Sequence, residues 1–178
     1  MTFTKAAILL SATLALSACQ NGFMGFGKDK DAAAGGLSTG ASASANGLGP
    51  DGVIEESSIA FFNTSVGDRV LFLVDQSTLT PEATAILDGQ ADWLMANPQY
   101  GALIEGHADE QGTREYNLGL GSKRASAVLN YLLSRGIPAN RLDTVTYGKE
   151  RPLAICSDET CWSKNRRAVT VVAGGIGS

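Results

Sequence analysis

Two residues of opposite charge, Asp109 and Arg124, could together bind a ligand that carries both signs. Asp109 follows a β-type segment that ends near His107, and a loop at a strand end is free to turn toward a ligand. Arg124 lies in a later segment with helical spacing. Its planar guanidinium can donate to a free carboxylate while Asp109 binds an ammonium group. Spacing alone also fits an ordinary, partly exposed salt bridge, which contributes about 0 to 1 kcal/mol.

Composition restricts the class of protein. The 178 residues are 44% hydrophobic and 18% charged, which is typical of one folded domain with additional segments. The formal net charge is -4, whereas binding to nucleic acid needs a basic surface that displaces counterions from phosphate. We therefore expect no nucleic-acid partner.

Residues 1–18 have the features of a secretory signal. Lys5 is followed by an apolar run over 6–16, which is too short to span a bilayer. The junction Leu16-Ser17-Ala18-Cys19 resembles the lipobox of bacterial lipoproteins, in which the signal is cut before the cysteine and the cysteine is acylated. We expect lipid at Cys19, with an ordinary signal peptide as the alternative. The absence of Asp at position 20, where Gln stands, favours the outer membrane.

Residues 19–57 are interpreted as the lipidated N-terminus and a flexible tether. They are rich in Gly, Ala, Ser and Asn up to about Pro50, with a brief charged patch over 28–31. Such a tether has a root-mean-square span of roughly 40 Å and a reach of well over 100 Å when extended. The domain of 58–178 can therefore act away from the membrane surface.

This domain alternates strand-like and helix-like patterns. The apolar run 69–74 predicts a strand covered on both faces. Thr80 and Pro81 predict the start of a helix that ends at Asn97-Pro98. The right-handed crossover rule then predicts an α/β two-layer sandwich, with a small mixed sheet of βαβαββ order and both main helices on one face. The other strands are expected at 102–107, 143–148 and 167–173.

The second main helix has two possible starts. Thr113 could cap a first turn, and Asn117 could cap the main helix. An unbroken helix from Thr113 would place Arg124 about 16 Å along the axis, too far to share a ligand with the preceding loop. Gly119 and Gly121 each disfavour helix by up to about 1 kcal/mol. We therefore expect a separate turn and a helix that begins near Asn117.

Cys156 and Cys161 are close together in a chain that we expect to be exported to an oxidising compartment. We expect them to form a disulfide that stabilises by about 2 kcal/mol or more and fixes the loop before the last strand. A metal site is the alternative, but two cysteines and the single histidine make a poor ligand set. We expect neither a metal nor another cofactor.

Several segments between about 66 and 172 resemble the OmpA-like peptidoglycan-binding domain family. They are 106–113, 115–118, 123–125, 147–150 with Pro152, and 165–169. The resemblance implies a non-enzymatic domain in which Asp109 and Arg124 bind the free end of diaminopimelate in the peptide stem of peptidoglycan. That free end carries one ammonium and one carboxylate, and we expect the two side chains to face it together, unpaired with other protein groups. Further positions that match the pocket are Thr113, Asn117, Leu120 and Asp75.

The chain departs from the family pattern at two positions. Many relatives have Phe-Asp-x-Asp after the first strand, whereas Leu73 here occupies the first acidic position and only Asp75 remains. Gly119 replaces a small polar residue at the start of the helix.

Two other functions are compatible with parts of the sequence. A hydrolase is suggested by the cluster of His107, Asp109 and Glu110 with Ser122 nearby, but one histidine cannot form a histidine metal dyad. The other is an envelope protein-interaction module, because lipid-anchored relatives bind the β-propeller protein TolB and act with the other Tol proteins at cell division. The resemblance thus implies a lipoprotein of the outer membrane whose periplasmic domain binds the cell wall.

Overall fold

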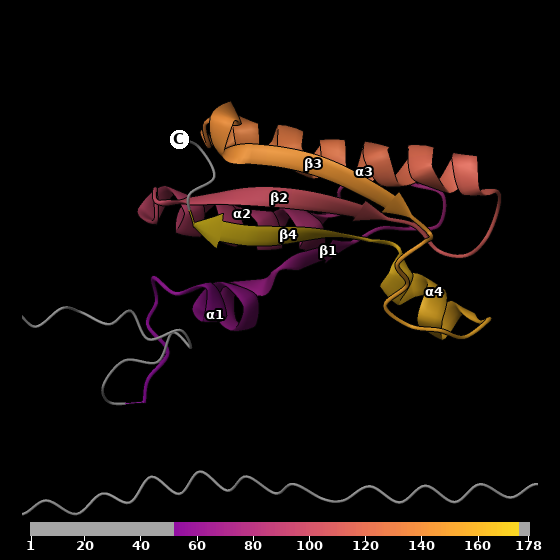
Figure 1. Ribbon diagram of the computed structural model, residues 1–178, viewed down its shortest axis with the longest axis horizontal. Helices are drawn as coiled ribbons and strands as arrows, with labels where there is room; N and C mark the ends of the chain where they lie inside the picture. Colours follow the sequence, from indigo (N-terminus) through magenta and orange to yellow (C-terminus); the bar gives the residue numbers. More distant parts are fainter. Residues whose placement is uncertain (1–51, 175–178) are drawn as a thin grey trace, which may run out of the picture. The chain divides into compact units, whose positions relative to one another are not determined.

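The structure is a computed structural model that describes residues 52–174 (Figure 1). The expected signal, the acylated Cys19 and the tether up to residue 51 lie outside the described residues. Within the described part, no helix has the length and apolar character that crossing a membrane would need.

Four strands form one mixed sheet in the order β1-β4-β2-β3. β2 and β3 are parallel, and β4 runs antiparallel to both of its neighbours, β1 and β2. The predicted α/β two-layer sandwich with a mixed sheet is confirmed. The strands are β1 (Arg69–Leu71), β2 (Tyr100–His107), β3 (Leu142–Gly148) and β4 (Arg167–Gly174).

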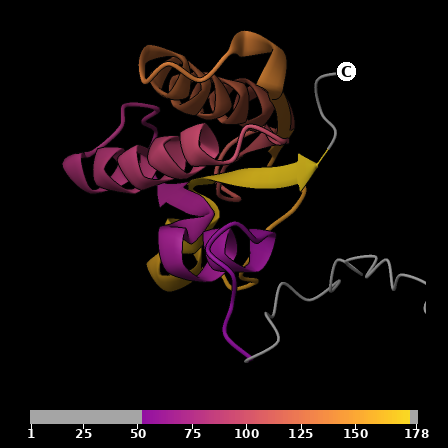
Figure 2. The same ribbon diagram turned by 90° about the vertical axis from the view of Figure 1, so that its left-hand side faces the viewer.

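Two long helices, α2 (Pro81–Ala96) and α3 (Arg114–Ser134), lie on the same face of the sheet (Figures 1 and 2). α2 starts as predicted, because the Thr80 hydroxyl accepts a hydrogen bond from the Ala83 N–H at 3.2 Å and Pro81 follows the cap. The apolar side chains between the two layers form the core. Its fully buried members include Leu87, Leu94, Ile104, Val128 and Leu132.

Three shorter segments complete the domain. α1 (Ile59–Phe61) continues into one wide helical turn, Phe62–Gly67, and Phe62 packs on Trp93 of α2 with ring centroids 4.9 Å apart. A 3-10 turn, Ala139–Arg141, leads into β3. α4 (Glu159–Asn165) lies beyond the end of the sheet (Figure 1).

β1 is shorter and more exposed than predicted. Of its three residues only Val70 is buried, while Leu71 remains half exposed. The prediction of a strand over 69–74 covered on both faces is wrong, because β1 is a three-residue edge strand that pairs only with β4 and whose first and third residues are exposed. The chain leaves the sheet after Leu71 and forms a loop instead.

α3 begins earlier than predicted. The Thr113 hydroxyl accepts from the Tyr116 N–H at 3.2 Å, and the helix runs unbroken from Arg114. The predicted start near Asn117 is therefore wrong. The reason is that Gly121 serves a tertiary contact: a Cβ there would lie 2.5 Å from the Thr146 hydroxyl oxygen and 3.0 Å from the Gly106 carbonyl oxygen. This glycine lets the helix approach the sheet closely and does not mark a break.

His107 is buried on the sheet face opposite α3. Its ring packs on Tyr147 with centroids 5.5 Å apart, and neither ring nitrogen has a hydrogen-bond partner among residues 52–174. Burial, together with the positive charges of Arg167 and Arg151, lowers the pKa of His107 from 6.5 to about 4. The imidazole is therefore neutral in the folded domain at neutral pH.

The two glycines of α3 should respond oppositely to alanine. Gly121→Ala should destabilise the domain by about 1 to 3 kcal/mol, because the added methyl group collides with the sheet. Gly119→Ala, the matched control, faces open space and should stabilise by about 0.5 to 1 kcal/mol through helix propensity. Urea unfolding measures both, and a neutral Gly121→Ala would contradict the close packing.

Acid should destabilise the domain through His107. Between pH 6.5 and pH 4 the unfolded chain binds a proton at His107, whereas the folded domain does not. The free energy of unfolding should therefore fall by up to about 3 kcal/mol as the pH is lowered over this range. His107→Gln should flatten this part of the pH dependence. Unfolding measured at pH 7 and pH 4.5 tests the prediction, and identical pH dependence of the two proteins would refute it.

Candidate functional site

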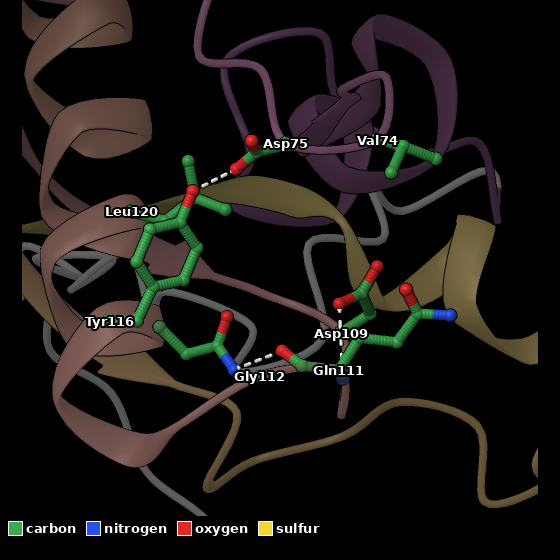
Figure 3. Close-up of a pocket in the computed structure, with 8 residues that line it drawn as sticks. Val74, Asp75, Asp109, Gln111, Gly112, Tyr116 and Leu120 are labelled. Atoms are coloured by element: carbon green, nitrogen blue, oxygen red, sulfur yellow. Dashed lines mark hydrogen bonds between the residues drawn. The ribbon is translucent and has the colours of Figure 1, made fainter.

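A pocket of about 240 Å³ lies where the loop after β1, the loop after β2 and the first turns of α3 meet (Figure 3). Four of the predicted site residues line it, namely Asp75, Asp109, Asn117 and Leu120. Thr113 instead caps α3, and the Arg124 side chain lies beneath the surface. The sequence reading missed the other lining residues, which are Val74, Gln111, Gly112 and Tyr116.

Asp109 is nearly buried and already has a charged partner. Its Oδ2 lies 3.2 Å from Nη1 of Arg166, and its Oδ1 accepts from the Gln111 N–H at 3.3 Å (Figure 3). Arg166 also pairs with Glu159 of α4. The carboxylate is thus fixed in orientation, with one side toward the pocket.

Arg124 is fully buried and donates to three backbone carbonyl oxygens. Its Nε bonds Gln76 at 2.8 Å, Nη1 bonds His107 at 2.9 Å and Nη2 bonds Leu73 at 3.2 Å. No carboxylate lies within ion-pair distance of it in the described part of the chain. Burial lowers the pKa of Arg124 to about 10, against the opposing effect of the Asp109 charge. The guanidinium therefore stays charged at neutral pH.

Two expectations about this pair need correction. The two charges are not presented free of other protein groups, since Asp109 pairs with Arg166 and carbonyl oxygens surround Arg124. The unbroken helix also does not carry Arg124 away from the loop. α3 folds back over β2, so Arg124 reaches the carbonyl of His107, two residues before Asp109. Distance along the helix axis was the wrong measure.

The loop after β1 covers the guanidinium. The carbonyls of Leu73 and Gln76 both point at it, and the Tyr116 hydroxyl donates to the carboxylate of Asp75 (Figure 3). This hydrogen bond raises the pKa of Tyr116. Asp75 has a left-handed φ of 57°, which costs about 1 kcal/mol or more for a residue other than glycine. Leu73, the departure from the family pattern, contributes its carbonyl, and its side chain is more than half exposed.

The side chains of Lys149 and Asn117 hold the loop after β2 in place. Lys149 Nζ donates to the Gly112 carbonyl at 2.7 Å, and Asn117 Nδ2 donates to the Gln111 carbonyl at 2.7 Å. Asn117 Oδ1 is buried and has no partner among the described residues. Because a buried acceptor without a donor is costly, this oxygen is a candidate contact for a ligand N–H group.

The residues of the hydrolase alternative are not brought together. His107 faces away from α3, and its ring nitrogens bond neither Asp109 nor Glu110. Ser122 is exposed on α3. The described residues therefore hold no hydrogen-bonded nucleophile and base of the kind that acyl transfer needs at this site.

Cys156 and Cys161 are joined by a disulfide, with Cα atoms 5.6 Å apart. Asp158 lies close to both sulfur atoms, but bonded sulfurs are not the thiolates that a metal ion would require. The bridge connects the loop after β3 to the first turn of α4.

Comparison with known proteins gives the family. The family model described as "OmpA family" matches residues 71–166. The chain is 49% identical to a peptidoglycan-associated lipoprotein of Rhizobium meliloti (strain 1021), over 96% of this chain and 88% of that protein. It is 46% identical to the protein of the same name from Brucella melitensis biotype 1, over 94% of this chain and 91% of that protein.

Solved structures agree. The crystal structure of the peptidoglycan-associated lipoprotein from Burkholderia pseudomallei matches with a TM-score of 0.60 and 39% identity, covering 62% of this chain and 96% of that one. The C-terminal domain of Helicobacter pylori MotB shares the fold alone, with a TM-score of 0.56 at 18% identity over 60% of this chain and 84% of that one. The chain therefore belongs to the OmpA family, among the peptidoglycan-associated lipoproteins.

Proposed function

We propose that this envelope lipoprotein binds peptidoglycan without covalent attachment, through the free end of diaminopimelate in the peptide stem. Asp109 and the Asn117 amide oxygen receive the ligand ammonium group, and Arg124 receives its carboxylate. The protein acts as an anchor and catalyses no reaction. The observation that carries the proposal is a pocket lined by the Asp109 carboxylate, together with a buried guanidinium that has no carboxylate partner among residues 52–174 and bonds the backbone of the loops that form the pocket.

Electrostatics supports the role of Arg124. A guanidinium has five N–H donors, and three are bonded to carbonyl oxygens here. One N–H on each of Nη1 and Nη2 remains beyond these three bonds, so the guanidinium still has two donors to offer to a carboxylate. A buried cation bonded only to neutral dipoles is also poorly compensated, so an arriving carboxylate gains more here than at a solvated arginine.

Access to this guanidinium requires the loop after β1 to move. Arg124 has no exposed surface, and the carbonyls of Leu73 and Gln76 lie against it. The ligand carboxylate therefore reaches the remaining N–H groups only after this loop has shifted. Val74 and Leu120 on the pocket wall offer apolar contact to the aliphatic part of the ligand.

We further propose that the domain is held to the outer membrane by lipid on Cys19, as the lipobox indicates, so that wall binding ties the membrane to the wall. The resemblance also supports TolB as a partner and a role in the Tol-Pal system during cell division. A TolB pull-down with the periplasmic domain tests the partnership, and failure to recover TolB at physiological salt would argue against it.

Removal of the Asp109 charge should weaken wall binding. Asp109→Asn keeps the shape of the side chain and should lower affinity for a diaminopimelate stem peptide roughly ten- to a hundredfold, the equivalent of about 1.5 to 3 kcal/mol for a charge-assisted hydrogen bond. Calorimetric titration measures this. Asp143→Asn, at an exposed position on β3, is the control that should bind normally. A change of less than twofold at Asp109 would contradict the assignment.

The ligand carboxylate should determine selectivity. Lysine-containing stems lack the carboxylate that Arg124 would receive, so the unaltered protein should bind them about tenfold or more weakly than diaminopimelate stems. This comparison needs no substitution and is therefore free of the folding defects that any change at a fully buried arginine brings. Equal affinity for the two stems would rule out the proposed role of Arg124.

The anchor makes a separate prediction about location. Cys19→Ser should move the protein from the membrane fraction to the soluble fraction of lysed cells, because acyl chains supply about 0.8 kcal/mol per buried CH₂ group. Fractionation with immunoblotting measures this. If Cys19→Ser remains in the membrane fraction after the peptidoglycan has been removed, the attachment does not depend on Cys19.

A further inference from the structure

α4 is a short element held by polar contacts and a cross-link more than by apolar packing. It has seven residues, of which only Asn165 is buried, and a helix of this length is not stable in isolation. The Asp158 carboxylate caps it by accepting from the Thr160 N–H at 2.8 Å. The Cys156–Cys161 disulfide holds its first turn to the preceding loop. With so little apolar packing, α4 is held by this cap, by the cross-link and by the buried Asn165, whose side-chain oxygen accepts from the N–H groups of Leu153 and Ala154.

The first residue of α4 is linked to the pocket through one arginine. Both Nη atoms of Arg166 donate to the Glu159 carboxylate, with Nη1 at 3.3 Å from Oε2. The same Nη1 donates to Asp109 Oδ2 at 3.2 Å, and Nε donates to the Phe72 carbonyl at 3.2 Å. Arg166 is buried, whereas the Glu159 side chain is 63% exposed. The contacts thus run from Glu159 through Arg166 to Asp109, and Glu159 lies two residues before Cys161 of the disulfide.

Charge balance gives Glu159 a role in ligand binding. Asp109, Glu159 and Arg166 together carry one excess negative charge, which an ammonium group would neutralise. Without Glu159, both Nη atoms of Arg166 become available to Asp109, and this carboxylate is neutralised by the protein itself. Glu159 therefore keeps Arg166 from neutralising Asp109 fully, while Arg166 still fixes the orientation of the Asp109 carboxylate.

We propose that Glu159 is a positioning residue for ligand binding at Asp109, acting through Arg166, and that the Cys156–Cys161 disulfide maintains this arrangement by ordering α4. The inference rests on the proposed wall-binding function and identifies a control of the same site. Reduction by a dithiol transfers two electrons and two protons to the bridge: the S–S bond breaks, two thiols form, and the dithiol is oxidised to its own disulfide. The reduced domain remains folded but binds more weakly.

The first test is titration of the oxidised wild-type domain and of variants with a diaminopimelate stem peptide. Glu159→Gln should lower the affinity five- to twentyfold, and Glu159→Asp should restore part of it, since the charge returns. Asp92→Asn removes an exposed carboxylate 3.6 Å from Arg135 at a different place on the domain and should bind as wild type. Thermal melting of each variant should change by only a few degrees.

The second test is reduction with dithiothreitol. The affinity of the wild type for the stem peptide should fall three- to tenfold while its circular dichroism spectrum is retained. A Cys156→Ser/Cys161→Ser variant should bind the peptide like the reduced wild type, and dithiothreitol should not change its affinity. Wild-type affinity in Glu159→Gln would overturn the positioning role, and unchanged affinity after reduction would overturn the role of the bridge. Failure of the oxidised wild type to bind the peptide at all would instead reject the proposed function.

Discussion

The buried guanidinium of Arg124 organises this domain around its site. It joins α3, the end of β2 and the loop after β1 through three hydrogen bonds to carbonyl oxygens. The three carbonyl oxygens approach the guanidinium from different directions. The planar guanidinium of arginine donates along several fixed directions at once, and a lysine ammonium would not reproduce these three hydrogen bonds. The Arg124 guanidinium thus holds together the loops that shape the pocket.

The other residues around the pocket are likewise not free side chains on a rigid surface. Asp109 is held by Arg166, the loop after β2 is held by Lys149 and Asn117, and Asp75 is held by Tyr116. Each bond lowers the number of orientations available before a ligand arrives. Little ordering of the pocket would therefore be left for a ligand to bring about.

The sequence predicted local features well and tertiary contacts poorly. The start of α2 followed from Thr80 and Pro81, and the sandwich followed from alternating apolar patterns, because these signals act within one or two turns of chain. The start of α3 was predicted wrongly because Gly121 is required by its close contact with Thr146 of the sheet. A contact between distant parts of the chain leaves no local sequence pattern. The pairing of Asp109 was invisible for the same reason, since its partner Arg166 lies far along the chain. Residue type and the family resemblance both indicated Asp109 and Arg124, whereas distance along a helix axis gave the wrong separation for them.

α1 and the pocket lie at opposite ends of the sheet. This placement determines the direction in which a mechanical load would act on the domain. The chain reaches α1 near the start of β1, whereas the pocket lies past the end of β2 (Figure 1). Tension between a membrane anchor and a bound wall fragment would then run roughly parallel to the strands. Interstrand hydrogen bonds in antiparallel pairs are perpendicular to that direction, so they would be sheared together rather than opened one after another. Such a geometry suits a fastener that must stay closed while two layers of an envelope are pulled apart.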